Sequence, residues 1–193
     1  MNRILFLFIL IVACHDSWSQ KSLVKKPFRF SITGGIGWNH YINSLKIGTN
    51  SAVEDHLGYS VKILREPEHR LAIGIESGYF PFYVVERSSS SSNLVVGRAS
   101  LSIVPIMLHF RCRVIKDFYI SAGTGIAVLL SSIKGIGGTV DSNQLSLSNF
   151  QVSTSYLKSI HPRIRVGGEL KYLSIDKTED ESLSLMAIAS FRF

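Results

Sequence analysis

The last thirteen residues, ESLSLMAIASFRF (Glu181 to Phe193), alternate between two kinds of side chain up to the final position. One parity is apolar: Leu183, Leu185, Ala187, Ala189, Phe191 and Phe193. The other is mixed: Ser182, Ser184, Met186, Ile188, Ser190 and Arg192. A period of two residues predicts a β-strand with one apolar face. Such a strand needs a neighbour on each side, because an open apolar edge aggregates. The sequence then has to show whether the apolar face meets a protein core or a lipid.

Seven earlier stretches show the same alternation, less regularly: residues 28–41, 56–64, 70–80, 98–113, 117–130, 149–160 and 163–173. Most have one apolar face and one face of small or polar residues. The stretch 98–113 is apolar on both parities around Pro105, so the sequence does not orient its faces. Proline cannot donate to a strand ladder, and Pro105 therefore predicts a bulge or a local break.

The connections between these stretches alternate in length. Short ones contain REPEH (65–69), VIKD (114–117) and HP (161–162), and long ones cover residues 41–55, 84–97 and 131–148. DKTED (176–180) is the exception, being short on the long side. Short turns at one end and long loops at the other are typical of bacterial outer-membrane barrels. The sequence therefore predicts an all-β fold, an eight-stranded antiparallel up-and-down transmembrane β-barrel over residues 27–193.

Aromatic residues gather near the two ends of the predicted strands, as expected for rings at two membrane interfaces. We expect the two aromatic girdles to include Phe28, Phe30, Trp38, Tyr79, Phe82 and Phe118. A soluble barrel would place more of its aromatics at strand centres. The apolar faces are accordingly expected to meet lipid.

The interior of an eight-stranded barrel is just wide enough for side chains. The inward positions predict a lumenal charge network of Arg29, Lys62, Glu76, Arg165, Glu169, Lys171 and Arg192. Buried charges must be paired or hydrated, so we expect Glu76 and Glu169 each to contact one of these cations. Two interpretations remain open: a lumen filled by a stabilising network, or a narrow path that prefers anions.

The N-terminus begins with Arg3 and continues with an apolar run from Ile4 to Ala13. The run is about half the length that a spanning helix needs, so it predicts a secretory signal peptide over residues 1–19, cut before Gln20. The alternative is a lipobox ending at Cys14, which would be lipidated after a cut before it. Residues 20–26 then form a short periplasmic segment before the barrel.

Composition limits the partners. The formal charge is +7, and Arg3 and Asp16 cancel, so the processed chain keeps this charge. An exported chain seldom meets nucleic acid, so outer-membrane lipid head groups and lipopolysaccharide are the expected anionic partners. Cys112 is left without a second cysteine, which excludes a disulfide framework.

Catalytic spacing is absent from the predicted strands. A His-x-Ser pair, which would bring a base to a nucleophile on one strand face, occurs only at His15 and Ser17, inside the signal. His109 is followed two residues on by Arg111, and His40 and Ser44 are four apart. No Cys or carboxylate cluster has metal-ligand spacing. We therefore expect no enzyme, no metal and no cofactor.

The strand patterns also carry a resemblance. From about Lys25 to Phe193 the chain resembles the outer membrane protein beta-barrel domain (porin-like) family of small Gram-negative barrels, in FRFSITGGIGWN, LSIVPIMLHF, FYISAGTGIAVLL, RIRVGGELKYLS and SLSLMAIASFRF. This resemblance implies a location in the outer membrane. The aromatic positions Phe191 and Phe193 resemble the C-terminal signal read by the barrel-insertion machinery. The resemblance implies no activity.

Three functional hypotheses follow. The first is a monomeric barrel whose long loops serve envelope integrity, adhesion or ligand contact. The second is a barrel component of an envelope export or assembly machinery. The third is a soluble periplasmic lipocalin-like lipid carrier, which the sorting of turns and loops disfavours. Loops on a rigid scaffold carry recognition, so residues 39–55 and 88–97 are the candidate contact loops.

Overall fold

The structure is a computed structural model, and it describes residues 29–42, 52–66, 70–88, 95–135 and 138–193. The predicted signal peptide, Cys14 and Phe28 lie outside the described residues. The described chain is built from nine strands: β1 (Arg29–Tyr41), β2 (Ala52–Val53), β3 (Asp55–Glu66), β4 (Leu71–Ser88), β5 (Val95–Ile115), β6 (Phe118–Gly135), β7 (Gly138–His161), β8 (Ile164–Ile175) and β9 (Asp180–Arg192). None of the described residues forms a helix long and apolar enough to cross a membrane.

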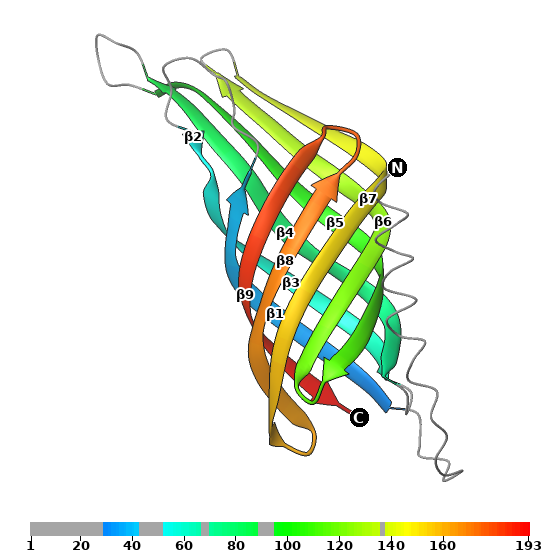
Figure 1. Cartoon of the computed structure of the whole chain (residues 1–193). Coiled ribbons are helices and arrows are strands. Elements are labelled where there is room, and N and C mark those ends of the chain that lie inside the picture. The colour runs from blue at the N-terminus through cyan, green and yellow to red at the C-terminus, as the bar shows by residue number, and fades with distance from the viewer. Residues whose placement is uncertain (1–28, 43–51, 67–69, 89–94, 136–137) are drawn as a thin grey trace.

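Eight of these strands close into a ring. Each pairs antiparallel with its neighbours in the order β1-β3-β4-β5-β6-β7-β8-β9, and β9 returns to β1. The two-residue β2 pairs only with β4 and lies outside the ring. Beyond the last strand, Phe30 N donates to Phe193 O at 3.1 Å and Phe193 N donates to Phe30 O at 3.0 Å. The predicted eight-stranded antiparallel barrel is confirmed, as Figure 1 shows.

The alternation in β9 separates outside from inside. Leu183 and Leu185 are exposed, whereas Ser184 and Met186 are buried inside the ring. Every strand of the ring adds exposed apolar side chains to what we call the apolar belt: Ile32, Ile36, Leu57, Val61, Ile63, Ile73, Ile75, Ile106, Leu108, Ile126, Tyr156, Val166, Leu170, Leu183 and Leu185. A continuous apolar surface of this kind is not left in water by a folded protein. The apolar row of the terminal strand therefore faces lipid.

Strand β5, which the sequence did not orient, turns its odd-numbered residues inward. Ile103, Met107 and His109 are fully buried, while Ile106 and Leu108 are exposed. The β4–β5 ladder is interrupted opposite Pro105, since partners run to Ser77–Ile106 and resume at Phe80–Ile103. The predicted local break is confirmed, and the bulge itself lies on β4 between Pro81 and Tyr83.

Four strands are much longer than the crossing requires. β4 to β7 have 18 to 24 residues, whereas β1, β3, β8 and β9 have 12 or 13. In Figure 1 they continue as a sheet past the ends of the other strands. We call this part, residues 82–88, 95–101, 131–135 and 138–148, the extension. The expectation of long loops at 84–97 and 131–148 was wrong for most of these residues, because they continue the strand ladders.

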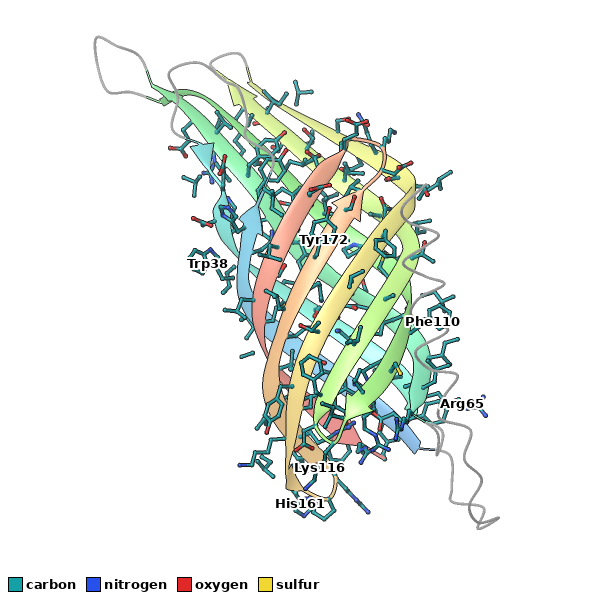
Figure 2. The ribbon with its side chains drawn as sticks, viewed as in Figure 1. Trp38, Arg65, Phe110, Lys116, His161 and Tyr172 are labelled. Atoms are coloured by element: carbon teal, nitrogen blue, oxygen red, sulfur yellow. The ribbon has the colours of Figure 1, made fainter. Side chains whose placement is uncertain are left out.

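The two ends of the barrel are named from their connections. The turn end holds the β5–β6 turn at Lys116–Asp117 and the β7–β8 turn at Pro162–Arg163, and the loop end holds the extension. Figure 2 places Arg65, Lys116 and His161 at the turn end, with Trp38 on the outside nearer the loop end.

Candidate functional site in the barrel lumen

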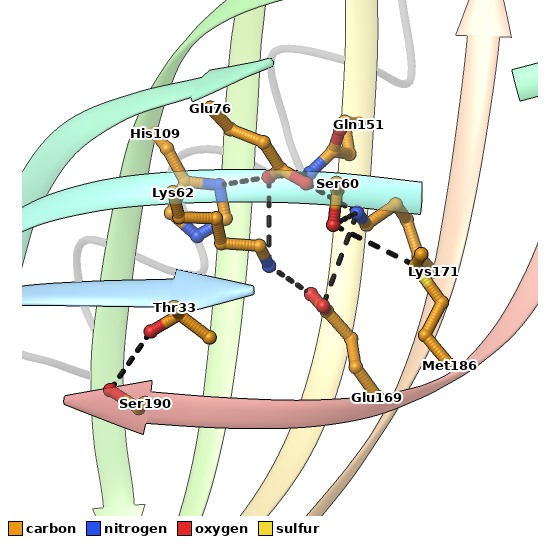
Figure 3. A network of polar contacts seen from close by, with 10 residues as sticks. All are labelled: Thr33, Ser60, Lys62, Glu76, His109, Gln151, Glu169, Lys171, Met186 and Ser190. Carbon is orange, nitrogen blue, oxygen red and sulfur yellow. Dashed lines mark hydrogen bonds and ion pairs between the residues drawn. The ribbon is translucent and has the colours of Figure 1, made fainter. Parts of the chain in front are cut away.

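A layer of four charged side chains crosses the middle of the lumen. Lys62 on β3 and Lys171 on β8 face Glu76 on β4 and Glu169 on β8, as Figure 3 shows. Lys62 is paired with Glu169, and its Nζ also lies 3.6 Å from Glu76 Oε2. Lys171 is paired with Glu76, and its Nζ lies 3.9 Å from Glu169 Oε2. Two cations and two carboxylates make this layer neutral, so the expected contact of each carboxylate with a cation is present.

Neutral polar groups complete the middle layer. Gln151 Nε2 donates to Glu76 Oε2 at 2.5 Å, and His109 Nδ1 lies 3.0 Å from the same oxygen. Lys171 Nζ donates to Ser60 Oγ at 3.3 Å. Glu76, His109, Gln151 and Lys171 have no exposed surface. The network is therefore held inside the ring, although His109 Nε2, Gln151 Oε1 and Glu169 Oε2 have no hydrogen-bond partner among the described residues.

A second layer lies closer to the turn end and is centred on Glu66. Its carboxylate is paired with Arg111, accepts from Arg165 Nη2 at 2.5 Å and lies 2.7 Å from Arg192 Nη2. Arg165 Nη1 also donates to Tyr119 Oη at 2.8 Å. One carboxylate holds three guanidinium groups, so this layer carries a net positive charge.

An apolar layer fills the lumen on the side of the extension. Phe80, Phe82, Ile103, Leu173 and Ile175 are fully buried there. The Lys171 ammonium lies 5.0 Å from the centroid of the Phe80 ring, which joins the apolar layer to the charged middle. The three layers together place buried side chains along the length of the lumen.

The charged groups of this lumen contact one another. Each of its carboxylates forms an ion pair with at least one cation, and no described residues form a group of three metal-ligating side chains. The histidines weighed above meet carboxylates: His109 contacts Glu76, and His40 Nδ1 lies 2.6 Å from Asp55 Oδ1. Ser44, considered beside His40, lies outside the described residues.

The structure divides the predicted lumenal residues between two layers. Lys62, Glu76, Glu169 and Lys171 share the middle layer, and Arg165 and Arg192 belong to the layer around Glu66. The side chain of Arg29 lies outside the description. Sequence reasoning missed Glu66, His109 and Arg111. Glu66 had been assigned to a turn, and the other two lie on the strand whose faces were not oriented.

The predicted girdle residues mostly lie on the outer surface. Phe30, Trp38 and Phe118 are exposed and Tyr79 is half-buried. Phe82 is a correction: its side chain is fully buried in the lumen. Phe82 has the same inward parity as Glu76. Full burial of its ring in the lumen removes more apolar surface from water than a position at the membrane interface would.

Phe191 and Phe193 are both exposed at the turn end, with ring centroids 6.4 Å apart, and Phe193 lies 6.1 Å from the Phe30 ring. Cys112 is buried and forms no disulfide, which fits an inert packed thiol.

No protein-family model and no curated protein sequence matches the chain. Solved structures match it as a fold. Ail, the attachment invasion locus protein of Yersinia pestis, superposes with a TM-score of 0.57 at 14% identity, over 87% of this chain and 100% of Ail. Ail is also known in complex with the heparin analogue sucrose octasulfate. A major outer membrane protein of Thermus thermophilus gives a TM-score of 0.57 at 12% identity, with the same coverage of both chains.

The fold is that of the small outer-membrane barrels. The apolar belt then explains why so many large apolar side chains lie outside the ring. The chain is a small outer-membrane β-barrel protein.

Proposed function

We propose that this barrel neither conducts nor catalyses, and that its working part is the extension, which faces the outside of the cell. The observation that carries this proposal is the one-sided pairing of β7. From Asn149, which pairs with Ile175, towards the turn end, β7 pairs with both β6 and β8. From Gly138 to Ser146 it pairs with β6 alone. Among the described residues, this edge of the extension has no strand partner, and Lys177 Nζ donates to Leu145 O on it at 3.4 Å.

An open strand edge can bind a partner by adding a further strand. Natural edges are protected by proline, lysine or inward charges. Residues 138–148 contain neither proline nor lysine, and their only charged residue is Asp141. The edge therefore suits an extended segment of another protein.

Charge at the loop end argues for a protein rather than a polyanion. The described acidic side chains there are Glu54, Asp55, Glu86, Asp141, Asp176, Glu179, the buried Asp180 and Glu181. The described cationic side chains there are Arg98, Lys134 and Lys177. Although Ail was solved with a heparin analogue, we expect this surface to favour protein partners over heparin.

The setting of the proposal is the outer membrane, with outer-membrane lipid and lipopolysaccharide around a monomeric barrel. Phe191 and Phe193 are proposed as the part read by the barrel-insertion machinery. Processing before Gln20, or lipidation of Cys14, belongs to the same proposal as the export step.

The first test shortens the extension without touching the ring. Ser131 and Ser142 are cross-strand partners, so residues 132–141 can be replaced by Asn-Gly, which closes a two-residue hairpin. The control replaces only Ile136 and Gly137 by Asn-Gly. Gram-negative cells displaying each form are scored for attachment to surfaces coated with host-cell protein extract and to surfaces coated with heparin. We expect the full chain and the control to attach to a protein surface and the shortened chain to lose this.

The second test addresses the lumen. The pure barrel in planar bilayers should give no steady conductance, because all three layers are packed. Steady anion-selective conductance would overturn the closed lumen, and undiminished attachment by the shortened chain would overturn the role of the extension. If both forms equally restore detergent resistance to cells that lack the barrel, the result would instead favour envelope integrity as the role.

A further inference from the structure

The outer face of β5 and β6 changes character over three cross-strand pairs above the apolar belt. On this outer face Val104 pairs with Val128, and the next pair towards the extension is Ser102 with Leu130. Next come Ser100 and Ser132, which are partners, and then Arg98 and Lys134, which are partners as well. Hydroxyls followed by cations at the upper edge of an apolar surface coincide with the depth at which lipid head groups lie.

Arg98 and Lys134 are like charges directly opposite each other in an antiparallel ladder. Such pairs destabilise a sheet unless an anion lies between them. Glu86 approaches Arg98 at 3.6 Å, but both side chains are about half exposed, at 46% and 53%, so this pair contributes little. Asp141 is the partner of Ser132 and lies diagonally from Lys134, and no ion pair reaches Lys134 among the described residues.

The same four residues line a pocket. Arg98, Ser100, Ser132 and Lys134 surround a hollow of about 230 Å³ on the surface. A guanidinium, an ammonium and two hydroxyl donors converging on one hollow are the groups that bind phosphate oxygens. The rest of the described loop end is mostly acidic, so these cations are a local feature and not part of a general basic surface.

We propose that this hollow binds a phosphate group of a phosphorylated glycolipid in the outer leaflet. The acyl chains of such a lipid would lie along Val104, Leu130 and the belt below, while the phosphate sits between Arg98 and Lys134. Free phosphate offers the same oxygens without the chains. The inference rests on the proposed orientation, with the extension outside the cell, because only then does the site meet that leaflet.

The experiment uses the full processed barrel in detergent, which makes the binding measurement independent of orientation. The probes are fluorescent lipid A with both phosphates, the same lipid dephosphorylated, and inorganic phosphate as competitor. The variant is Arg98→Gln with Lys134→Gln. The control is Lys158→Gln with Arg163→Gln, which removes the same charge from exposed positions at the turn end. A swap, Arg98→Lys with Lys134→Arg, tests whether charge alone suffices.

We expect the double variant to lose on the order of thirtyfold in affinity for lipid A, about fivefold for each cation. The control should change by less than about twofold, the swap should retain most of the affinity, and dephosphorylated lipid should bind the unmodified protein as weakly as lipid A binds the double variant. Equal binding of lipid A by the unmodified protein and the double variant would overturn the site. Complete displacement by millimolar phosphate would overturn the lipid as its source.

Heat-dependent gel mobility confirms that each variant is folded before binding is compared. Protease accessibility of the extension on intact cells tests the orientation separately. Digestion only after the outer membrane is opened would refute the orientation and leave the binding result standing, so the two failures are distinguishable.

Discussion

Lys171 illustrates how the lumen depends on single residues. Its ammonium is fully buried and is held by Glu76, by Ser60 at 3.3 Å and by the Phe80 ring. A buried charge without its partner costs far more than the intact pair contributes. The stability of the middle layer is therefore a property of the set of charges and not of any one contact.

Replacing Lys171 by Met should destabilise the barrel by about 3–5 kcal/mol, because Glu76 then lacks its closest cation. Adding Glu76→Gln to this variant should recover part of the loss. Urea unfolding followed by heat-dependent gel mobility measures both. Lys177→Met, at an exposed lysine of the loop end, is the control. A single variant as stable as the unmodified barrel would contradict the network.

Gly167 is a residue at which even one methyl group is too much. A Cβ added there would lie 1.7 Å from Tyr156 O on the neighbouring strand, whereas one added at Gly34 would meet nothing within 4 Å. We expect Gly167→Ala to reduce the folded yield sharply and Gly34→Ala to leave it unchanged, as judged by the fraction of heat-modifiable barrel. Equal yields would show that the backbone of β7 and β8 relaxes at this point.

The lumenal residues could be predicted from the sequence only on strands where apolar and polar residues alternate clearly. Lys62, Glu76, Glu169 and Lys171 lie on strands with one clearly apolar face, so their inward direction followed. His109 and Arg111 were missed because β5 carries apolar residues on both faces: Ile106 meets lipid and Met107 meets the apolar layer. The sequence shows no alternation of polar and apolar residues here, because lipid and the apolar layer both favour apolar side chains.

At the scale of elements, the pairing of β1 with β9 decides how the ring is closed. The backbone of Phe193 exchanges two hydrogen bonds with Phe30, and its ring stacks on those of Phe30 and Phe191. Aromatic pairs of this kind add about 0.5–1.5 kcal/mol beyond their burial.

Phe193→Ala should keep the backbone hydrogen bonds and lose the ring contacts. If Phe193 is read during insertion, the amount of inserted barrel should fall several-fold in cells, far more than the small loss in stability explains. Phe118→Ala, at an exposed aromatic of the same end on β6, should insert normally. Immunoblots of outer-membrane fractions compare the Phe193→Ala and Phe118→Ala variants. Equal insertion would mean that Phe193 acts only as a girdle residue and is not read during insertion.

The extension is the element that the sequence predicted least well. Residues 84–97 and 131–148 are rich in Ser, Gly and Asn, which indicate loops. In the structure, Ser131–Ser142 and Ser132–Asp141 are ordinary cross-strand pairs. The β6–β7 ladder in the extension continues the pairing of the same two strands in the ring. This tertiary context outweighs the local preference of these residues for loops.

For the whole molecule, the apolar belt sets the depth at which the barrel sits. Leu185 is 61% exposed within the belt, and Leu145 is 49% exposed on β7 in the extension. Arginine at the centre of a lipid-facing surface costs about 2–4 kcal/mol and little beyond the interface. Leu185→Arg should therefore destabilise the barrel in lipid by that amount, while Leu145→Arg should be tolerated.

Urea titrations in liposomes measure the two Leu→Arg variants side by side. Equal destabilisation would place Leu145 in lipid as well and move the boundary of the belt upward. Equal tolerance would mean that the belt does not meet lipid, and would return the chain to the class of soluble carriers. The overall architecture was predictable because every strand of the ring contributes apolar residues to this belt. The length by which β4 to β7 continue beyond the belt was not predictable.

The closing of the ring also sets a problem of timing. Thr33 and Ser190, which are hydrogen-bonded at 2.9 Å, are 157 positions apart, whereas the other pairs in the ring join successive strands that can zip up as hairpins. The entropy lost on closing a loop grows with its length, so β1 should meet β9 late. Until then the nascent sheet has two unpaired edge strands and an exposed apolar surface. We therefore expect the outcome for each copy to depend on how long the sheet stays open and on how many chaperones are free to cover both edge strands. A copy that stays open too long aggregates before it reaches the membrane.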